Sequence, residues 1–170
     1  EITVETSEVA EDFNLVEVST PGMSSGEVHS SATQLQARMA LELGALELAI
    51  NKLGERDIER FRDLADIANS FIDGDKFIDA VKFTEANADF HEFLFRRANN
   101  EALLAAYQNL QVVQEMNATL PGAEWIDPAI ATEHLALVDA VSQNDLETAR
   151  TIIREHAEHG IDTMVKALEK

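Results

Sequence analysis

Cysteine is absent from the 170 residues of this chain. Disulfide bonds and thiolate metal ligands are therefore excluded, and a reducing compartment is the expected setting. The chain also lacks an apolar run of about 18 residues, the length that a membrane-spanning helix needs. Its first residues, EITVETSEVAED, are acidic where a secretory signal would be basic and then apolar. We therefore expect a cytoplasmic protein.

Basic residues are scarce. The chain has 13 lysines and arginines against 32 aspartates and glutamates, and its formal net charge is −19. Binding to nucleic acid phosphates or to anionic membranes depends on lysine and arginine. This chain alone is therefore not expected to bind DNA or a membrane surface, and the simplest role of its acidic excess is a well-solvated surface.

Hydrophobic residues make up 45% of the chain, which is enough for one well-filled core in a single domain. Residues 1–28 contain the loop-like stretch STPGMSSGE and a weak strand signal, NLVEV, so we expect an irregular acidic segment or linker there. Residues 29–170 are expected to form one all-α domain. Periodicity and breaks predict six helices, over 30–53, 55–72, 75–98, 100–118, 127–143 and 145–168, with Asn144 as one of the caps. Their short joints predict an antiparallel bundle.

Polar side chains interrupt the apolar face of the segment NADFHEFLFRRANN, residues 87–100. At about 100° per residue, Phe83, Phe90 and Leu94 all lie within about 60° of Asn87. His91 lies one turn after Asn87, on the same side. A buried imidazole or amide costs free energy unless it is paired. We therefore expect other parts of the chain to supply partners for both.

Two more histidines face inward by the same angular test. His134 is in phase with the apolar residues of the helix over 127–143, and His156 with those of the helix over 145–168. His159 lies at the edge of the face that carries His156, where it is expected to support the site rather than to bind metal. His29 precedes the first clear helix and fits the pattern less well.

Three inward histidines on three helices, with an amide oxygen one turn from the first, form a natural ligand set for a divalent transition metal. Side chains at i and i+4 of one helix can hold a single ion between them. We therefore expect a metal at Asn87, His91, His134 and His156, with zinc or nickel favoured and manganese or iron as alternatives. The plainer alternative is a set of core histidines that hydrogen bond within the protein.

Arg38 also faces inward by phase. A guanidinium keeps its proton, so it needs an anion when it is buried. Glu42, one turn later, could provide that anion in an ion pair within the helix. Alternatively, Arg38 binds the carboxylate of a ligand through two parallel hydrogen bonds, with Glu42 nearby in a supporting position. The sequence leaves both possibilities open.

Taken in order, these segments resemble a known family. They are ARMALELGALELA (37–49), NADFH (87–91), ANNEAL (98–103), the EH of 133–134 and the stretch from Asp145 to the REH that ends at His156. The pattern is similar to the effector-binding domain of the FCD subgroup of GntR-type bacterial transcriptional regulators, named after the C-terminal domain of FadR. The resemblance covers about residues 30–168.

The resemblance implies an antiparallel bundle of six or seven helices around a central metal and ligand pocket. It implies a divalent metal at Asn87, His91, His134 and His156, the same four residues as the angular test. It further implies that Arg38 meets the carboxylate of a small organic acid, and that the domain is a homodimer. Where this sequence has Asn87 the family often has aspartate, which would weaken metal binding and strengthen the attraction of an anion.

The DNA-binding winged helix of GntR-type regulators is not found in this sequence, because residues 1–28 are too short and too acidic for it. DNA binding would therefore need a domain outside this chain. The alternative is a stand-alone metalloenzyme that acts on a small carboxylate or carbonyl compound through the same metal. It would need a general base, and by helix phase only Glu42 faces inward. We therefore expect a domain that senses a small organic acid rather than an enzyme.

Overall fold

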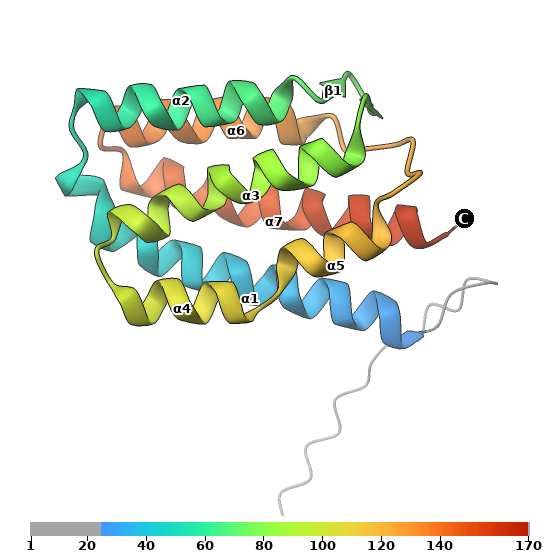
Figure 1. The fold of residues 1–170 in the computed structure, drawn as a ribbon. Coiled ribbons are helices and arrows are strands. Elements are labelled where there is room, and N and C mark those ends of the chain that lie inside the picture. The colour runs from blue at the N-terminus through green and yellow to red at the C-terminus, as the bar shows by residue number, and fades with distance from the viewer. Residues whose placement is uncertain (1–24, 170) are drawn as a thin grey trace, which may run out of the picture.

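The computed structural model describes residues 25–169, which contain seven α-helices, one 3₁₀-helix and one two-stranded hairpin (Figure 1). The elements are α1 (Ser25–Ala49), η1 (Ile50–Lys52), α2 (Glu55–Asn69), β1 (Ile72–Asp73), β2 (Lys76–Phe77), α3 (Ala80–Arg97), α4 (Glu101–Asn109), α5 (Val112–Thr119), α6 (Ala129–Ser142) and α7 (Leu146–Leu168). The all-α fold expected from the sequence is confirmed.

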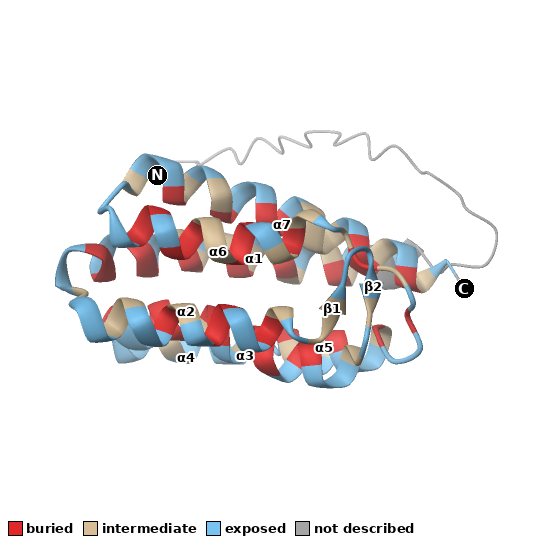
Figure 2. Ribbon diagram, turned by 90° about the horizontal axis from the view of Figure 1, so that it is seen from above, coloured by how far each residue is buried: buried red, intermediate tan, exposed pale blue. Residues whose placement is uncertain are grey.

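Five long helices enclose the centre of the bundle. Helix α1 packs against α7 and α3, α6 packs against α7 and α2, and α2 packs against α3, so the contacts form a closed ring. The shorter α4 and α5 follow α3 and lie at opposite ends of the molecule (Figure 1). Buried residues line the facing sides of the helices, and exposed residues cover the outside (Figure 2). A residue that points inward from any of the five helices therefore approaches the same interior.

Aromatic rings fill one half of that interior. Phe61 of α2 stacks on Phe90 and Phe93 of α3, with ring centroids 4.7 and 4.6 Å apart. A second apolar cluster includes Phe83, Met116 and other residues nearer the hairpin. Burying a side chain of this size stabilises the fold by roughly 1.5–3 kcal/mol. These contacts hold α3 rigidly between the two clusters.

Three details differ from the sequence expectation. The predicted helix 100–118 is two helices, because Gln111 between α4 and α5 adopts a left-handed conformation with φ 55°. Residues 72–77, divided between two predicted helices, form a hairpin in which Ile72 pairs with Phe77 around Gly74. Asn144, expected as a cap, has φ 56°, and Asp145 caps α7 instead by accepting a hydrogen bond from the Thr148 amide.

The N-terminal end of the fold also differs slightly, since α1 begins at Ser25 rather than near residue 30. The weak strand signal NLVEV, residues 14–18, lies outside the described residues. Within residues 25–169 no helix is both long enough and apolar enough to cross a membrane.

Candidate metal and effector site

Three histidines from three helices meet at the centre of the bundle. His91 of α3, His134 of α6 and His156 of α7 are buried, and each offers a ring nitrogen that lies within 4.8 Å of the others. The Nε2 atoms of His91 and His156 are 3.2 Å apart. The Oδ1 atom of Asn87 is 3.1 Å from Nε2 of His134. The structure thus brings together all four residues that the sequence predicted as metal ligands.

Local sequence explains this convergence. Asp79 caps α3 by accepting a hydrogen bond from the Lys82 amide, which sets where the helix begins. Asn87 and His91 then fall one turn apart on the face that points into the ring of helices. Phe90, next to His91, packs against the ring of His134 with centroids 4.5 Å apart. The aromatic core therefore positions the histidines from two helices relative to each other.

Each of the three histidines has an oxygen atom against its other ring nitrogen. The distances from Nδ1 are 2.8 Å to Glu42 Oε1 for His91, 2.8 Å to Asn69 Oδ1 for His134, and 3.0 Å to Glu133 Oε2 for His156. In metal sites, oxygen partners of this kind orient the histidine rings. They hold the proton on the nitrogen that faces away from the ion.

The amide of Asn69 determines which nitrogen of His134 carries the proton. The Asn69 Nδ2 group donates a hydrogen bond to the Ala131 carbonyl at 2.8 Å, so its Oδ1 must face His134. Nδ1 of His134 is then the donor, and Nε2 presents a lone pair toward the Asn87 oxygen. Carboxylates at His91 and His156 favour the same tautomer. In that state all three Nε2 atoms and the Asn87 oxygen present electron pairs to one another.

Burial keeps the imidazoles neutral. Loss of solvation lowers the pKa values of His91, His134 and His156 well below the usual range of histidine. Burial also raises the pKa of Glu42 to about 7, although the nearby Arg38 guanidinium acts in the opposite direction. Neutral imidazole is the form that binds metals.

The residues present fit a divalent transition metal. The three histidines can hold such an ion, since their lone pairs converge and their protonated nitrogens already have acceptors. The amide oxygen of Asn87 adds a harder ligand atom, which transition metals accept together with imidazole. All four donors are uncharged, so a bound ion would keep its full positive charge for an anionic ligand.

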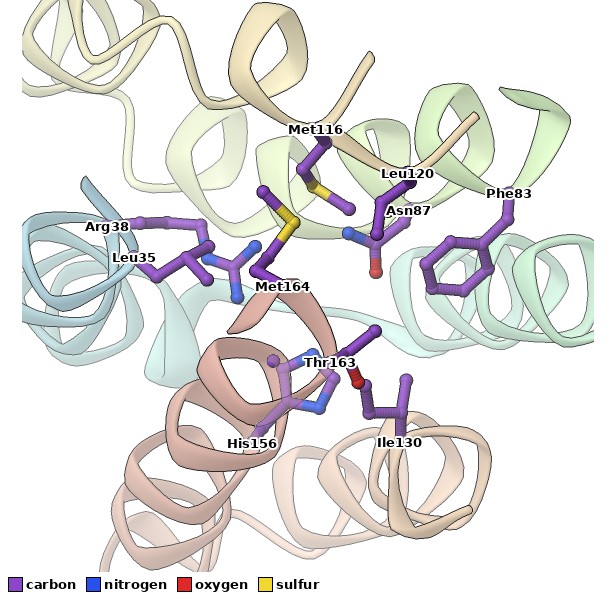
Figure 3. Close-up of a pocket in the computed structure, with 11 residues that line it drawn as sticks. Leu35, Arg38, Phe83, Asn87, Met116, Leu120, Ile130, His156, Thr163 and Met164 are labelled. Carbon is purple, nitrogen blue, oxygen red and sulfur yellow. The ribbon is translucent and has the colours of Figure 1, made fainter. Parts of the chain in front are cut away.

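Arg38 lies at the cavity next to this cluster (Figure 3). Its side chain is only 3% exposed, and its Nε atom is buried without a hydrogen-bond partner. The ion pair with Glu42 that the sequence left open does not occur among the described residues, where the Glu42 carboxylate is bonded to His91 instead. Within the described part of the chain this buried guanidinium therefore has no directly paired anion.

The cavity connects Arg38 with two of the four predicted metal ligands, Asn87 and His156, and has a volume of about 20 Å³. Its wall is mainly apolar, with residues from α1, α3, α5, α6 and α7: Leu35, Phe83, Met116, Leu120, Ile130, Gly160, Thr163 and Met164 complete the lining. Figure 3 shows Met116 and Met164 between Arg38 and Asn87. Methionine side chains adapt their shape easily, so this part of the wall is deformable.

Sequence reasoning missed two residues of the site. Glu133 is 9% exposed and binds both His156 and His159, although helix phase seemed to place it outside. It faces inward because α6 is in contact with α7 on one side and α2 on the other. Asn69 ends α2 one turn after the buried Ala65, so the angular test applied to that helix would have found it.

The two remaining histidines lie apart from the three that converge. His159 Nδ1 is 2.5 Å from Glu133 Oε1, so His159 is linked to His156 through that carboxylate, as expected from its place at the edge of the α7 face. Burial lowers the pKa of His159, but the hydrogen bond to Glu133 and the negative charges of Glu133, Asp127 and Asp162 together outweigh this effect, and the net pKa is raised. His29 is exposed on α1.

Comparison with solved structures supports the fold. The structure of E. coli McbR/YncC superimposes with a TM-score of 0.64 at 21% identity, over 79% of this chain and 63% of that chain. A transcriptional regulator (GntR family member) from Pseudomonas syringae pv. tomato str. DC3000 gives a TM-score of 0.66 at 17% identity, over 83% of this chain and 58% of that chain.

Sequence comparison gives the family. An uncharacterized HTH-type transcriptional regulator of Bacillus subtilis (strain 168), YcbG, is 27% identical over 138 residues, which are 80% of this chain and 55% of that protein. This chain thus spans about half the length of that curated relative, which is named as a transcriptional regulator. The family model described as FCD domain matches residues 34–159. The resemblance found in the sequence is confirmed, and the chain belongs to the FCD domain family.

Proposed function

We propose that this chain is the ligand-sensing domain of a GntR-type transcriptional regulator. It binds a small organic acid at a buried divalent metal held by Asn87, His91, His134 and His156. The observation that carries the proposal is the meeting of four lone-pair atoms beside a buried arginine that forms no ion pair among residues 25–169. A cation and a carboxylate together would satisfy both sets of groups.

Each residue has a distinct part in this function. Glu42, Asn69 and Glu133 hold the protonated nitrogens of the three histidines, so that the opposite nitrogens stay available to the ion. When bound, the ion supplies positive charge within a protein whose net charge is −19. Arg38 adds a second positive group in the same cavity and can pair with a carboxylate through two hydrogen bonds. Zinc and nickel suit the donor set best, with manganese or iron as alternatives.

Sensing is a better account of the site than catalysis. The metalloenzyme alternative needed Glu42 as a general base. In the structure Glu42 is 2% exposed and its carboxylate is hydrogen bonded to His91, one of the proposed metal ligands. A carboxylate in that role is not free to take a proton from a substrate.

The remaining parts of the proposal follow from membership of the family. DNA binding is assigned to a winged-helix domain outside residues 25–169, since the acidic surface of this chain repels phosphates. A regulator of this kind works on DNA as a homodimer in the bacterial cytoplasm. The effector changes DNA affinity by favouring one arrangement of the two subunits.

Metal content tests the central claim. Protein purified without a histidine tag is analysed by inductively coupled plasma mass spectrometry, beside the His91→Ala/His134→Ala double variant. The exposed His29→Ala variant is the matched control. We expect roughly one equivalent of a transition metal, as for one four-ligand site, in wild type and in the control, and none in the double variant. An absence of metal from wild type even after incubation with Zn²⁺ or Ni²⁺ would refute the site.

Binding of small organic acids tests the second part of the proposed function, the identity of the effector. Zinc-loaded protein is titrated with citrate, malonate and lactate by isothermal calorimetry, and each acid is recovered and analysed afterwards. A sensor binds at least one acid and returns it unchanged. Turnover of the acid, lost in Glu42→Gln while zinc is retained, would instead establish the enzyme.

A further inference from the structure

The cavity beside Arg38 is too small for an organic acid. Its volume of about 20 Å³ offers room for roughly one water molecule. Even the smallest carboxylic acids have several non-hydrogen atoms. If the proposed function holds, part of the cavity wall has to move when the effector enters.

Four of the five helices that line the cavity are held by the polar network of the site. Residues on α1, α3, α6 and α7 take part in the hydrogen bonds that Glu42 accepts from His91 and Glu133 accepts from His156. Helix α5 contributes Met116 and, at its C-terminal cap, Leu120 to the wall, but none of the described bonds that orient the histidines. The movable part is therefore to be sought in α5.

Helix α5 also has few buried side chains to hold it in place. Only Val112 and Met116 are buried among its eight residues, whereas nine of the 18 residues of α3 are buried. Segments with few buried apolar side chains open at lower free energy than the rest of a protein. In Figure 1, α5 lies at the side of the bundle, and it is in contact with α1, α3 and α7.

Both ends of α5 carry backbone conformations suited to a hinge. Gln111, directly before the helix, has φ 55° and ψ 33°, which is unfavourable for a residue with a long side chain. Gly122, two residues after the C-terminal cap, has φ 78°. Rotation about these two points would shift α5 outward without disturbing its internal hydrogen bonds.

One polar contact holds α5 against α1. The Ser31 hydroxyl donates a hydrogen bond of 2.6 Å to the Glu115 carboxylate. Among the described residues this is the only side-chain hydrogen bond between α5 and another helix. Ser31 is 1% exposed and lies in the second turn of α1, the helix that also carries Arg38.

We propose that α5 is a movable wall of the effector site, held closed in the unliganded protein by the Ser31–Glu115 hydrogen bond. An acid that enters between Arg38 and Met116 swings α5 outward about Gln111 and Gly122. The hydrogen bond to Ser31 breaks, so the first turns of α1 lose their contact with Glu115 when the site is occupied. The identity of the ligand rests on the proposed function, whereas the mobility of α5 is independent of it.

Hydrogen–deuterium exchange on the ligand-free protein tests the mobility. We expect the amides of α5 to exchange at least about tenfold faster than those of α3 and α7. Ser31→Ala should make amide exchange in α5 faster still, because the hydrogen bond to Glu115 is lost. Thr33→Ala is the matched control, since Thr33 is exposed on the same helix and bonds only to backbone carbonyls of α1. Exchange in α5 as slow as in α3, or unchanged by Ser31→Ala, would overturn the proposal.

Citrate binding to zinc-loaded protein tests the coupling. If the hydrogen bond to Ser31 must break for entry, Ser31→Ala should bind citrate about fivefold more tightly with zinc affinity unchanged. Thr33→Ala should bind citrate like wild type. Unchanged or weaker citrate binding by Ser31→Ala would refute the coupling. If wild type binds none of citrate, malonate and lactate, the proposed function fails, while the exchange experiment still decides whether α5 moves.

Discussion

The Nε2 atoms of His91 and His156 face each other across 3.2 Å at the centre of the bundle. On the far side of each ring, Nδ1 lies against a carboxylate, that of Glu42 or that of Glu133. When both Nδ1 atoms carry the proton, both facing nitrogens present lone pairs, which repel unless a positive ion lies between them. This relationship supports the proposal that a metal ion binds there.

Zinc is therefore expected to stabilise the fold. At a free concentration of 100 times its dissociation constant, an ion that binds only the folded state adds about 2.7 kcal/mol, or roughly 5–10 °C in melting temperature for a domain of this size. Differential scanning fluorimetry with and without zinc measures the shift. His156→Ala should abolish it, and the exposed His29→Ala should retain it; equal shifts in both variants would contradict the site.

Asn69→Ala should weaken metal binding although Asn69 is not a ligand. Without its oxygen, Nδ1 of His134 loses the acceptor that holds the proton away from the ion. Loss of such a partner typically costs 10–100-fold in affinity, which competition with a chromophoric chelator measures. Asn51→Ala, at an exposed position, is the control. Unchanged affinity in Asn69→Ala would show that His134 is not oriented in this way.

Asn87→Asp should shift the balance between metal and effector. A carboxylate at this position adds a negative charge to the donor set, so zinc is expected to bind about tenfold more tightly, or about 1.4 kcal/mol. The same charge should repel an acid, and citrate affinity of the zinc-loaded variant should fall. Calorimetry measures both affinities. A parallel rise in the two would contradict the electrostatic argument.

Arg38→Met should raise stability while it removes effector binding. The guanidinium is buried without an ion pair among the described residues, and replacing such a group with an apolar side chain of similar size is often favourable. We expect the free energy of unfolding in urea to increase by about 1–2 kcal/mol and citrate binding to be lost, with zinc retained. Arg154→Met, at an exposed position, makes the same charge change and should alter neither.

His159 should stabilise the fold more in mild acid than in base. Its pKa is raised in the folded state, so the stabilisation is complete below the unfolded pKa of about 6.5 and is lost as pH rises through the folded value. His159→Gln should therefore lower the free energy of unfolding more at pH 6 than at pH 8.5, by only about 0.5 kcal/mol because the side chain is 33% exposed. Urea titrations of zinc-free protein measure the difference. A larger loss at pH 8.5 would contradict the assigned direction.

Much of the site could be predicted because helical phase is a local property. Asn87 and His91 occur among phenylalanines and leucines at helical spacing, and that spacing alone directs them inward. The same argument held for His134, His156 and Arg38, all of which are buried. The angular test did not identify Glu133 as inward-facing. A helix with neighbours on two sides buries two adjacent positions, and phase counted from one apolar stripe identifies only one of them.

Backbone conformation between helices was less predictable. The division of the helix expected over 100–118 depends on Gln111, a residue type with no preference for the left-handed region. The hairpin at 72–77 pairs strands of only two residues each, too short for any periodic signal.

By itself the sequence determined the all-α class, the family and the inward direction of His91, His134 and His156, since these depend on periodicity and on the order of residues along the chain. Only the tertiary structure decided which oxygen meets which ring nitrogen, that Glu42 binds His91 rather than Arg38, and that α5 lines the cavity. Such contacts join residues tens of positions apart, as in the 49 between Glu42 and His91, and their geometry depends on how whole helices pack.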